Sequence, residues 1–242
     1  MIFEHNYEVV VKDLGKGNKV TNKAFLGYME EIASLHSSTV GYGVDDVERN
    51  GVAWILMDWK LKVIDRPKYK EMLNIKTWAR ESNKLYSYRD FEVYDEKGNL
   101  VAVASSKWVL IDINKRRIIK IDEELIEKYN PETGKQVFDE IDIEKVKEPE
   151  DYASNIEYIV KKSDIDVNKH MHNLNYLDLA YEALPNDIYE NVNRLNNVRI
   201  TYKKEIKLGD TVKCSYTNEN NKHIITIKDK DDKIIHSIIE LN

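Results

Sequence analysis

One order of elements occurs twice along this chain of 242 residues. In the first half, a strand pattern at residues 3–11 is followed by a loop, a helical pattern over 21–37 and a series of further strand patterns. In the second half, a strand pattern at 156–161 is followed by a polar loop, a helical pattern over 174–184 and more strands. A helix packed on an antiparallel sheet is a common α+β layer arrangement. The repetition therefore predicts two units of one α+β fold in tandem.

The predicted sheets are made of hairpin-connected strands. Asp95–Asn99 and Asp229–Asp232 are polar, turn-rich stretches between apolar runs, as at the tip of a β-hairpin. The strand patterns of the first unit are 52–64, 73–79, 87–94 and 100–112, and those of the second unit are 198–206, 211–217, 223–228 and 234–241. These patterns place the first unit at 1–125, the second at 155–242, and a charged connector at 126–154 between them.

Composition limits the class of protein. Hydrophobic residues make up 42% and charged residues 33% of the chain, as in soluble globular proteins. No apolar run reaches 18 residues, and residues 1–5 do not resemble a signal peptide, so we expect no membrane span and no export signal. Cys214 is the only cysteine, which fits a reducing cytoplasm. The net charge of -6 argues against a nucleic-acid binder.

The polar loop of the second unit carries the chemistry. Asp166, Asn168 and His170 alternate, so an extended backbone would point all three side chains to one face. They offer an acceptor, a donor and a titratable base. The following helix is apolar nearly all round, which predicts burial, with Asn173 as its N-cap and Pro185 after its end. Its free N–H groups could hold a developing oxyanion. The simpler interpretation is that these polar residues only form a loop and cap the helix.

The loop also resembles a known motif. Asp166 to Asn173 reads Asp-Val-Asn-Lys-His-Met-His-Asn and is followed by Tyr176. It resembles the active-site segment of acyl-acyl carrier protein thioesterases, usually Asp-x-Asn-x-His-x-Asn-Asn and then Tyr. These are double hot-dog proteins, each unit a long helix wrapped by an antiparallel sheet, that release fatty acids from acyl carrier protein. The chain departs from the pattern at His172, to which we therefore assign no catalytic role.

A second segment resembles the same family. Tyr202-Lys203-Lys204-Glu205 matches the family's Tyr-Arg-Arg-Glu, in which the Glu is catalytic. The family's next residue is Cys, but this chain has Ile206, so no cysteine nucleophile acts at that position. Without the resemblance, Glu205 would be interpreted as a surface carboxylate at the end of a strand.

The resemblance implies a thioester hydrolase. We expect no cofactor and no metal, because His170 and His172 are two residues apart and lack Cys or further His at ligand spacing. Asp166 would be the nucleophile or the general base for water, and Asn168 would donate to the carbonyl or fix the water. His170 would position that group and protonate the leaving thiol, and Glu205 would activate or orient the water. The loop at 13–20 has no His, so we expect one active site per chain, with the first unit shaping the acyl pocket.

Other functions remain open at this stage. The fold would also suit an acyl-CoA thioesterase, a hydratase or a non-catalytic acyl-binding protein. The oligomeric state is open too, between a monomeric pseudo-dimer and a homodimer. Large side chains of the first unit would either line an acyl tunnel or, as we favour, pack the core; they are Trp54, Met57, Trp59, Trp78 and Trp108.

The expected partner is an acyl carrier protein, which is strongly acidic. Because this chain is acidic as well, docking would need a local basic surface. One candidate surface surrounds Glu205 and another ends the first unit; they comprise Arg194, Arg199, Lys203, Lys204 and Lys207, and Lys115, Arg116, Arg117 and Lys120.

Overall fold

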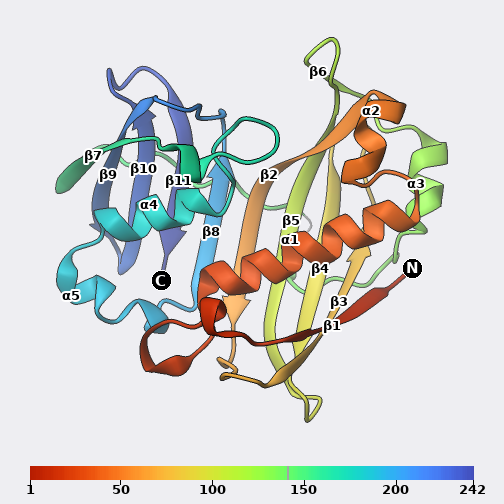
Figure 1. The fold of residues 1–242 in the computed structure, drawn as a ribbon, viewed down its shortest axis with the longest axis horizontal. Coiled ribbons are helices and arrows are strands. Elements are labelled where there is room, and N and C mark those ends of the chain that lie inside the picture. The colour runs from red at the N-terminus through yellow and green to blue at the C-terminus, as the bar shows by residue number, and fades with distance from the viewer. Residues whose placement is uncertain (141) are drawn as a thin grey trace. The chain divides into compact units, whose positions relative to one another are not determined.

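The computed structural model describes residues 1–140 and 142–242 and divides into two compact units, Met1–Ile143 and Glu144–Asn242. Both units consist of an antiparallel sheet with few helices (Figure 1). Among the described residues, no helix combines the length and the apolar character needed to cross a bilayer.

The first unit is built on a sheet of strand order β1-β3-β4-β5-β2, with β6 paired to β5. Its strands are β1 (Phe3–Glu8), β2 (Val52–Val63), β3 (Met72–Ala79), β4 (Ser87–Tyr94), β5 (Leu100–Asp112) and β6 (Arg117–Ile119). Its helices are α1 (Asn22–Thr39), α2 (Val47–Asn50) and α3 (Glu123–Tyr129).

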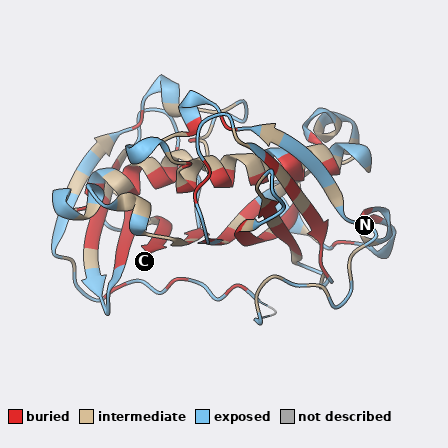
Figure 2. Ribbon diagram, turned by 90° about the horizontal axis from the view of Figure 1, so that it is seen from below, coloured by how far each residue is buried: buried red, intermediate tan, exposed pale blue. Residues whose placement is uncertain are grey.

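Helix α1 lies across one face of this sheet (Figure 1). Thr21 caps its start, because the Thr21 Oγ1 accepts from the Ala24 N–H at 3.1 Å. Its buried residues recur at helical spacing and include Phe25, Met29 and Ile32. Figure 2 shows that buried positions also dominate the central strands of the sheet. The core of the unit therefore lies between α1 and the sheet.

The second unit has the strand order β8-β11-β10-β9-β7. Its strands are β7 (Ser154–Ile159), β8 (Asn197–Tyr202), β9 (Thr211–Glu219), β10 (Lys222–Asp229) and β11 (Ile235–Leu241), and its helices are α4 (Asn175–Ala183) and α5 (Asn186–Tyr189). The prediction that the helix is buried nearly all round is wrong. Leu177 and Ala180 on α4 are fully buried, but Glu182 is exposed, so α4 buries one side only.

The two units share a detail of local structure before their helices. In the first unit, Asp13 Oδ2 accepts from the Val10 N–H at 2.8 Å and the Tyr28 hydroxyl at 2.6 Å. In the second, Asp164 Oδ2 accepts from the Lys161 N–H and the Tyr158 hydroxyl, both at 2.8 Å. In each unit this aspartate closes the 3-10 turn that follows the first strand. The predicted strand at 3–11 is consequently too long, since a 3-10 turn begins at Val11.

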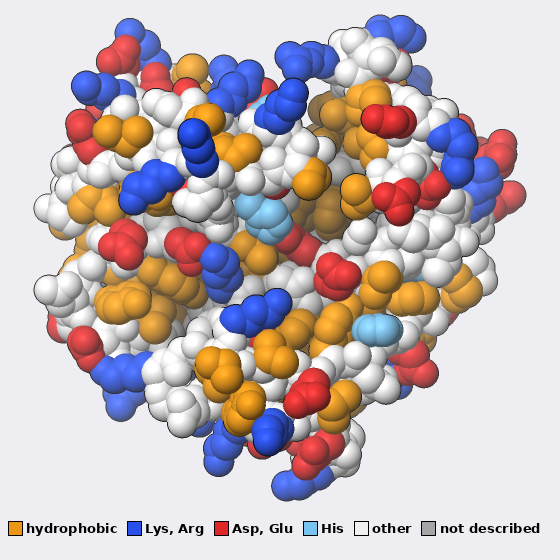
Figure 3. Space-filling view, in the orientation of Figure 1, with side chains coloured by type: hydrophobic (Ala, Val, Ile, Leu, Met, Phe, Trp, Pro, Cys, Tyr) orange, Lys and Arg blue, Asp and Glu red, His pale blue; other side chains and the backbone are white. Residues whose placement is uncertain are grey.

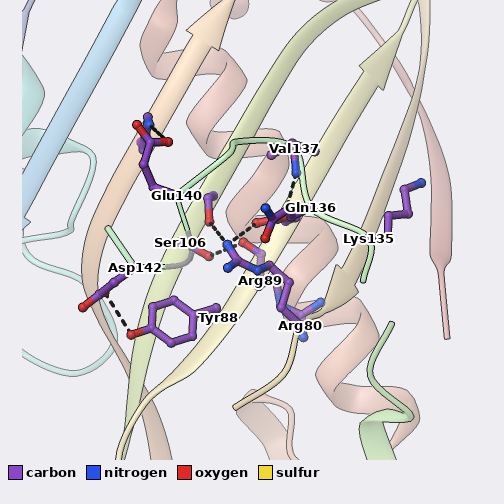
Figure 4. A network of polar contacts seen from close by, with 12 residues as sticks. Arg80, Tyr88, Arg89, Ser106, Lys135, Gln136, Val137, Glu140 and Asp142 are labelled. Atoms are coloured by element: carbon purple, nitrogen blue, oxygen red, sulfur yellow. Dashed lines mark hydrogen bonds and ion pairs between the residues drawn. The ribbon is translucent and has the colours of Figure 1, made fainter. Parts of the chain in front are cut away.

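Residues 135–140 and 142, which we call the strap, form hydrogen bonds with residues of β4 and β5 in the first-unit sheet (Figure 4). The Val137 N–H donates to Asp90 Oδ2 at 3.0 Å. Asp142 Oδ1 accepts from Lys107 Nζ at 2.8 Å and from the Tyr88 hydroxyl at 2.9 Å. Asp90 is fully buried, and burial raises the pKa of its carboxyl although Arg80 lies 3.5 Å away.

Candidate active site

The segment Asp166–His170 is a tight turn. The Asp166 N–H donates to the His170 carbonyl at 2.8 Å, and the Lys169 N–H to the Asp166 carbonyl at 3.1 Å. Lys169 has a φ of 64°, in the left-handed region. The prediction of an extended segment that presents three side chains on one face is therefore wrong.

The side chain of Asp166 explains why the chain turns here. Its Oδ1 accepts from the N–H of Asn168 at 2.8 Å and from the N–H of His170 at 3.2 Å. Aspartate commonly competes with regular structure by bonding to its own backbone in this way. Asn168 Nδ2 lies 3.3 Å from Asp166 Oδ2, so the amide and the carboxylate still meet.

Glu205 reaches this turn from the loop that follows β8. Strand β8 ends at Tyr202, so the predicted strand through 206 is too long. The N–H groups of Lys203 and Lys204 both donate to the His236 carbonyl, at 2.8 and 3.2 Å, and the chain then leaves the sheet. Glu205 therefore belongs to a loop rather than to a strand.

A backbone pairing brings His170 and Glu205 together. The Met171 N–H donates to the Ile206 carbonyl at 2.9 Å, and His170 forms a bridge with Lys207. His170 Nε2 lies 3.6 Å from Glu205 Oε1, a distance for an ion pair rather than for a direct hydrogen bond. Lys207 Nζ lies at the same distance from that oxygen. The side chains of His170 and Glu205 are 31% and 48% exposed, so both can meet a substrate.

The start of α4 differs from the prediction. Asn173 is not the N-cap, because the helix begins at Asn175 and no side chain caps it from Leu174. Instead, the Leu174 N–H donates to His172 Nδ1 at 3.2 Å, and the Asn175 N–H to the His172 carbonyl at 2.9 Å. The Asn173 carbonyl accepts from the Tyr202 hydroxyl at 3.1 Å. His172 therefore has a structural role that sequence reasoning missed.

Tyr176 is a buried residue of α4 that contacts the loop carrying Glu205. Its hydroxyl donates to the Lys204 carbonyl at 3.5 Å and so links α4 to the Glu205 loop. Burial raises the pKa of this hydroxyl, and the charges of Glu205 and Asp166 raise it further. Tyr176 therefore stays protonated and serves as a donor at neutral pH.

The lone cysteine lies apart from these groups. Cys214 on β9 is fully buried, as predicted for a small apolar residue, and burial raises the pKa of its thiol to about 12. A thiolate is the reactive form, so this thiol is inert at neutral pH. Among the described residues, no group of three or more His, Cys, Asp or Glu side chains is placed to hold a metal ion.

The first unit contains the same turn without the same side chains. The Gly15 N–H donates to the Lys19 carbonyl at 2.9 Å, and the Asn18 N–H to the Gly15 carbonyl at 3.2 Å. These bonds match those of Asp166 with His170 and of Lys169 with Asp166. Gly15 thus takes the place of Asp166, Gly17 that of Asn168, and Lys19 that of His170.

Arg66 takes the place of Glu205 in this comparison. The Val20 N–H donates to the Pro67 carbonyl at 3.0 Å, just as the Met171 N–H donates to the Ile206 carbonyl. Arg66 is buried, and it donates to the Val20 carbonyl at 2.9 Å and to Asn22 Oδ1 at 2.7 Å. The equivalent turn therefore has neither carboxylate nor imidazole, which supports the expectation of one site per chain.

Comparison with known proteins agrees with this structure. The model of the acyl-ACP thioesterase N-terminal domain matches residues 1–129, and that of the C-terminal domain matches residues 147–240. Oleoyl-acyl carrier protein thioesterase 2 of Arabidopsis thaliana is 22% identical over 93% of this chain and 65% of its own length. The dodecanoyl-[acyl-carrier-protein] hydrolase of Cinnamomum camphora is 24% identical over 90% of this chain and 59% of its own length. The chain thus spans under two thirds of the length of these two relatives.

Two solved structures share the fold. An acyl-ACP thioesterase from Bacteroides thetaiotaomicron has a TM-score of 0.84 and 18% identity, over 99% of this chain and 96% of that one. The 12:0-ACP thioesterase from Umbellularia californica has a TM-score of 0.85 and 19% identity, over 100% and 96%. The protein is thus of the hot-dog-like α+β class. It belongs to the acyl-ACP thioesterase family, which confirms the resemblance inferred from its two motifs.

Proposed function

We propose that this protein hydrolyses the thioester of fatty acyl-acyl carrier protein and releases free fatty acid, and that its two units are hot-dog units in tandem. Family membership supports this activity. The observation that carries it is the approach of His170 Nε2 to Glu205 Oε1, at 3.6 Å, beside the turn that holds Asp166 and Asn168. A proton-transfer pair open to solvent suits the attack of water on a thioester.

The residues divide the reaction between them. Glu205 takes a proton from water as the water oxygen bonds to the thioester carbon. The exposed Asn168 amide donates to the carbonyl oxygen, where negative charge develops. His170 orients the water and passes a proton to the sulfur as the carbon–sulfur bond breaks. The products are a fatty acid and the free thiol of the carrier.

The side chain of Asp166, unlike those of Asn168, His170 and Glu205, is held by main-chain groups of its own turn. Its Oδ1 accepts two main-chain N–H groups of its own turn. This geometry favours a positioning role, in which Asp166 fixes Asn168 and His170, over the roles of direct nucleophile or general base. The Discussion gives a pair of variants that separates these roles.

Thiol release from a panel of acyl-acyl carrier protein and acyl-CoA substrates tests the activity. We expect release from the carrier-bound acyl chains and little from His170→Ala. Equal turnover of acyl-CoA would favour an acyl-CoA thioesterase, and binding without thiol release an acyl-binding protein. Loss of an enoyl double bond without thiol release would indicate a hydratase.

We propose that the carrier protein docks beside Glu205. Lys203 and Lys204 are exposed just before Glu205 in the chain, and Lys207 Nζ lies 3.6 Å from Glu205 Oε1. Arg194 is exposed too, but it precedes β8 and so lies at the opposite end of that strand from Glu205, and the Arg199 guanidinium is bonded to the Glu144 carbonyl. Figure 3 shows Lys and Arg side chains interspersed with Asp and Glu on the face in view. Docking would therefore depend on a small number of cations rather than on a basic face.

A further inference from the structure

Two turns of the first unit meet at one end of its sheet. One lies in the loop between β1 and α1, and the other joins β2 to β3 (Figure 1). Lys19 of the first turn forms a backbone bridge with Lys68 of the second, and the Lys70 N–H donates to the Val9 carbonyl at 2.9 Å. The two turns therefore form one continuous surface.

This surface is basic in a protein that is acidic as a whole. Residues 8–23 and 64–71 contain seven Lys and Arg side chains and four Asp and Glu side chains, whereas the chain has a net charge of -6. Three of the lysines are fully exposed and one is partly exposed. We call these four residues the basic patch; they are Lys12, Lys68 and Lys70, which are exposed, and Lys19.

Two of the nearby acidic groups bond within the turns. Asp13 is buried, and its Oδ2 accepts from the Val10 N–H at 2.8 Å. Glu71 Oε2 accepts from the Lys68 N–H at 3.2 Å. Local backbone bonding is a common use of carboxylates in turns. The geometry of the turns thus accounts for these carboxylates, but it does not account for the lysines.

Exposed apolar side chains lie among the lysines. Val11, next to Lys12, is 69% exposed, and Tyr69, between Lys68 and Lys70, is 48% exposed. Lys70 Nζ lies 5.4 Å from the centre of the Tyr69 ring. Figure 3 shows hydrophobic side chains gathered at the lower edge of the face in view, where the loop before α1 lies. Apolar groups flanked by cations are typical of surfaces that bind membranes.

The equivalent turn of the second unit shows that the fold does not need a lysine at position 70. The Gly209 N–H donates to the Val160 carbonyl at 3.1 Å, just as the Lys70 N–H donates to the Val9 carbonyl. Gly209 has a φ of 83° and Lys70 a φ of 67°, so both lie in the left-handed region that favours glycine. Backbone strain at a residue other than glycine is found especially at functional sites.

We propose that this end of the first unit binds the surface of an anionic lipid membrane. The basic patch contacts lipid phosphates, and Val11 and Tyr69 enter the layer of headgroups. Lipid suits this surface better than an acidic protein, because single side chains on two short turns can enter a headgroup layer, whereas a protein interface needs a packed apolar core. The proposal does not depend on hydrolysis, since none of these residues belongs to the candidate active site.

Sedimentation of the protein with phospholipid vesicles tests the proposal. We expect binding to vesicles of equal parts phosphatidylglycerol and phosphatidylcholine, weakened by salt, and at least ~5-fold weaker binding to phosphatidylcholine alone. Lys68→Gln with Lys70→Gly should weaken binding to the anionic vesicles at least ~5-fold. Its Tm should be unchanged or higher, because glycine relieves the left-handed backbone. Lys84→Gln with Lys120→Gln removes the same charge at the opposite end of the sheet and should bind like the wild type.

A fluorescent label tests whether the apolar side chains enter the lipid. Because Cys214 is buried, a thiol-reactive, environment-sensitive dye can be attached to Val11→Cys alone. Its emission should shift to shorter wavelength on anionic vesicles and be quenched by spin-labelled lipid, whereas the same dye on Lys84→Cys should not respond. No binding to anionic vesicles, equal binding by the Lys68 and Lys70 variant, or an unshifted dye at residue 11 would overturn the proposal. A response to acyl carrier protein but not to vesicles would assign the surface to an acidic protein instead.

Discussion

His170 Nε2 and Glu205 Oε1 lie 3.6 Å apart, although one residue closes the turn before α4 and the other follows β8. The main chain, rather than the side chains, secures this approach. The Met171 N–H donates to the Ile206 carbonyl at 2.9 Å, which ties the two loops together one residue beyond each side chain. Either side chain can therefore be changed without loss of the pairing that aligns them.

His170→Ala and Glu205→Gln should each lower kcat by at least ~100-fold, the usual effect of losing a general acid or base. Thermal stability should change little, because both side chains reach solvent. An assay of thiol release measures the loss of kcat, and thermal unfolding measures the change in stability. Wild-type rates in both variants would refute the assignment.

Asp166 can be examined with two variants. Asp166→Ala removes the acceptor of two main-chain N–H groups, so we expect loss of activity and of about 1 kcal/mol of stability. Asp166→Asn keeps an oxygen that can accept from the same groups and should retain clearly more activity than Asp166→Ala. If both variants are equally inactive while Asp166→Asn keeps wild-type stability, Asp166 acts through its charge, as nucleophile or base.

Cys214 should be dispensable for catalysis. Because it is buried with a raised thiol pKa, Cys214→Ala should keep kcat within a small factor, and a thiol reagent should not label the native protein at neutral pH. Mass spectrometry of native and unfolded protein after labelling checks this. Rapid labelling of the native state together with inactivation would contradict it.

Salt should separate carrier-bound from small substrates. If Lys203 and Lys204 steer an acidic carrier, kcat/KM for the acyl-carrier substrate should fall as salt shortens the Debye length to ~8 Å at physiological ionic strength. Lys203→Glu with Lys204→Glu should have the same effect, whereas a small uncharged thioester should change much less. Lys16→Glu with Lys23→Glu in the first unit is a charge-matched control. Equal salt responses for both substrates would argue against docking here.

His36 should make folding stability depend on pH. The pKa of His36 is about 3 in the folded protein and 6.5 in the unfolded chain. Between these values only the unfolded chain binds the proton, so stability falls as the pH falls from 6.5 towards 3. The slope due to His36 is up to ~1.4 kcal/mol per pH unit. Urea unfolding at several pH values should show this slope in the wild type and a smaller one in His36→Gln, and equal slopes would contradict it.

Local patterns predicted the regular elements well. The bounds of β4 and β5 agree with the sequence because both strands end in a hairpin turn that Asp95 closes by accepting from the Lys97 and Asn99 N–H groups. Helix α1 begins where the helical pattern over 21–37 begins, and Thr21 is its N-cap. Such signals act within a few residues of the chain and can be found without knowledge of the fold.

The geometry of the site could not be predicted in the same way. Alternation of Asp166, Asn168 and His170 fits an extended strand as well as a turn. The chain forms a turn because the Asp166 side chain accepts from the N–H groups of Asn168 and His170. The approach of Glu205 depends on pairing between distant segments, which no local pattern encodes. The resemblance to a family identified these four residues, but it did not supply their spacing in three dimensions.

The strap determines where a fragment of this protein could be cut. Ending a fragment at residue 125, where the sequence pattern of the first unit ends, would remove the Val137 N–H from the buried Asp90 carboxylate and the Asp142 carboxylate from Lys107. It would also uncover Trp78, whose indole donates to the Lys135 carbonyl. A fragment of the first unit that is meant to stay folded should therefore extend through Ile143, so that the segment that leads to the second unit is kept as part of the first.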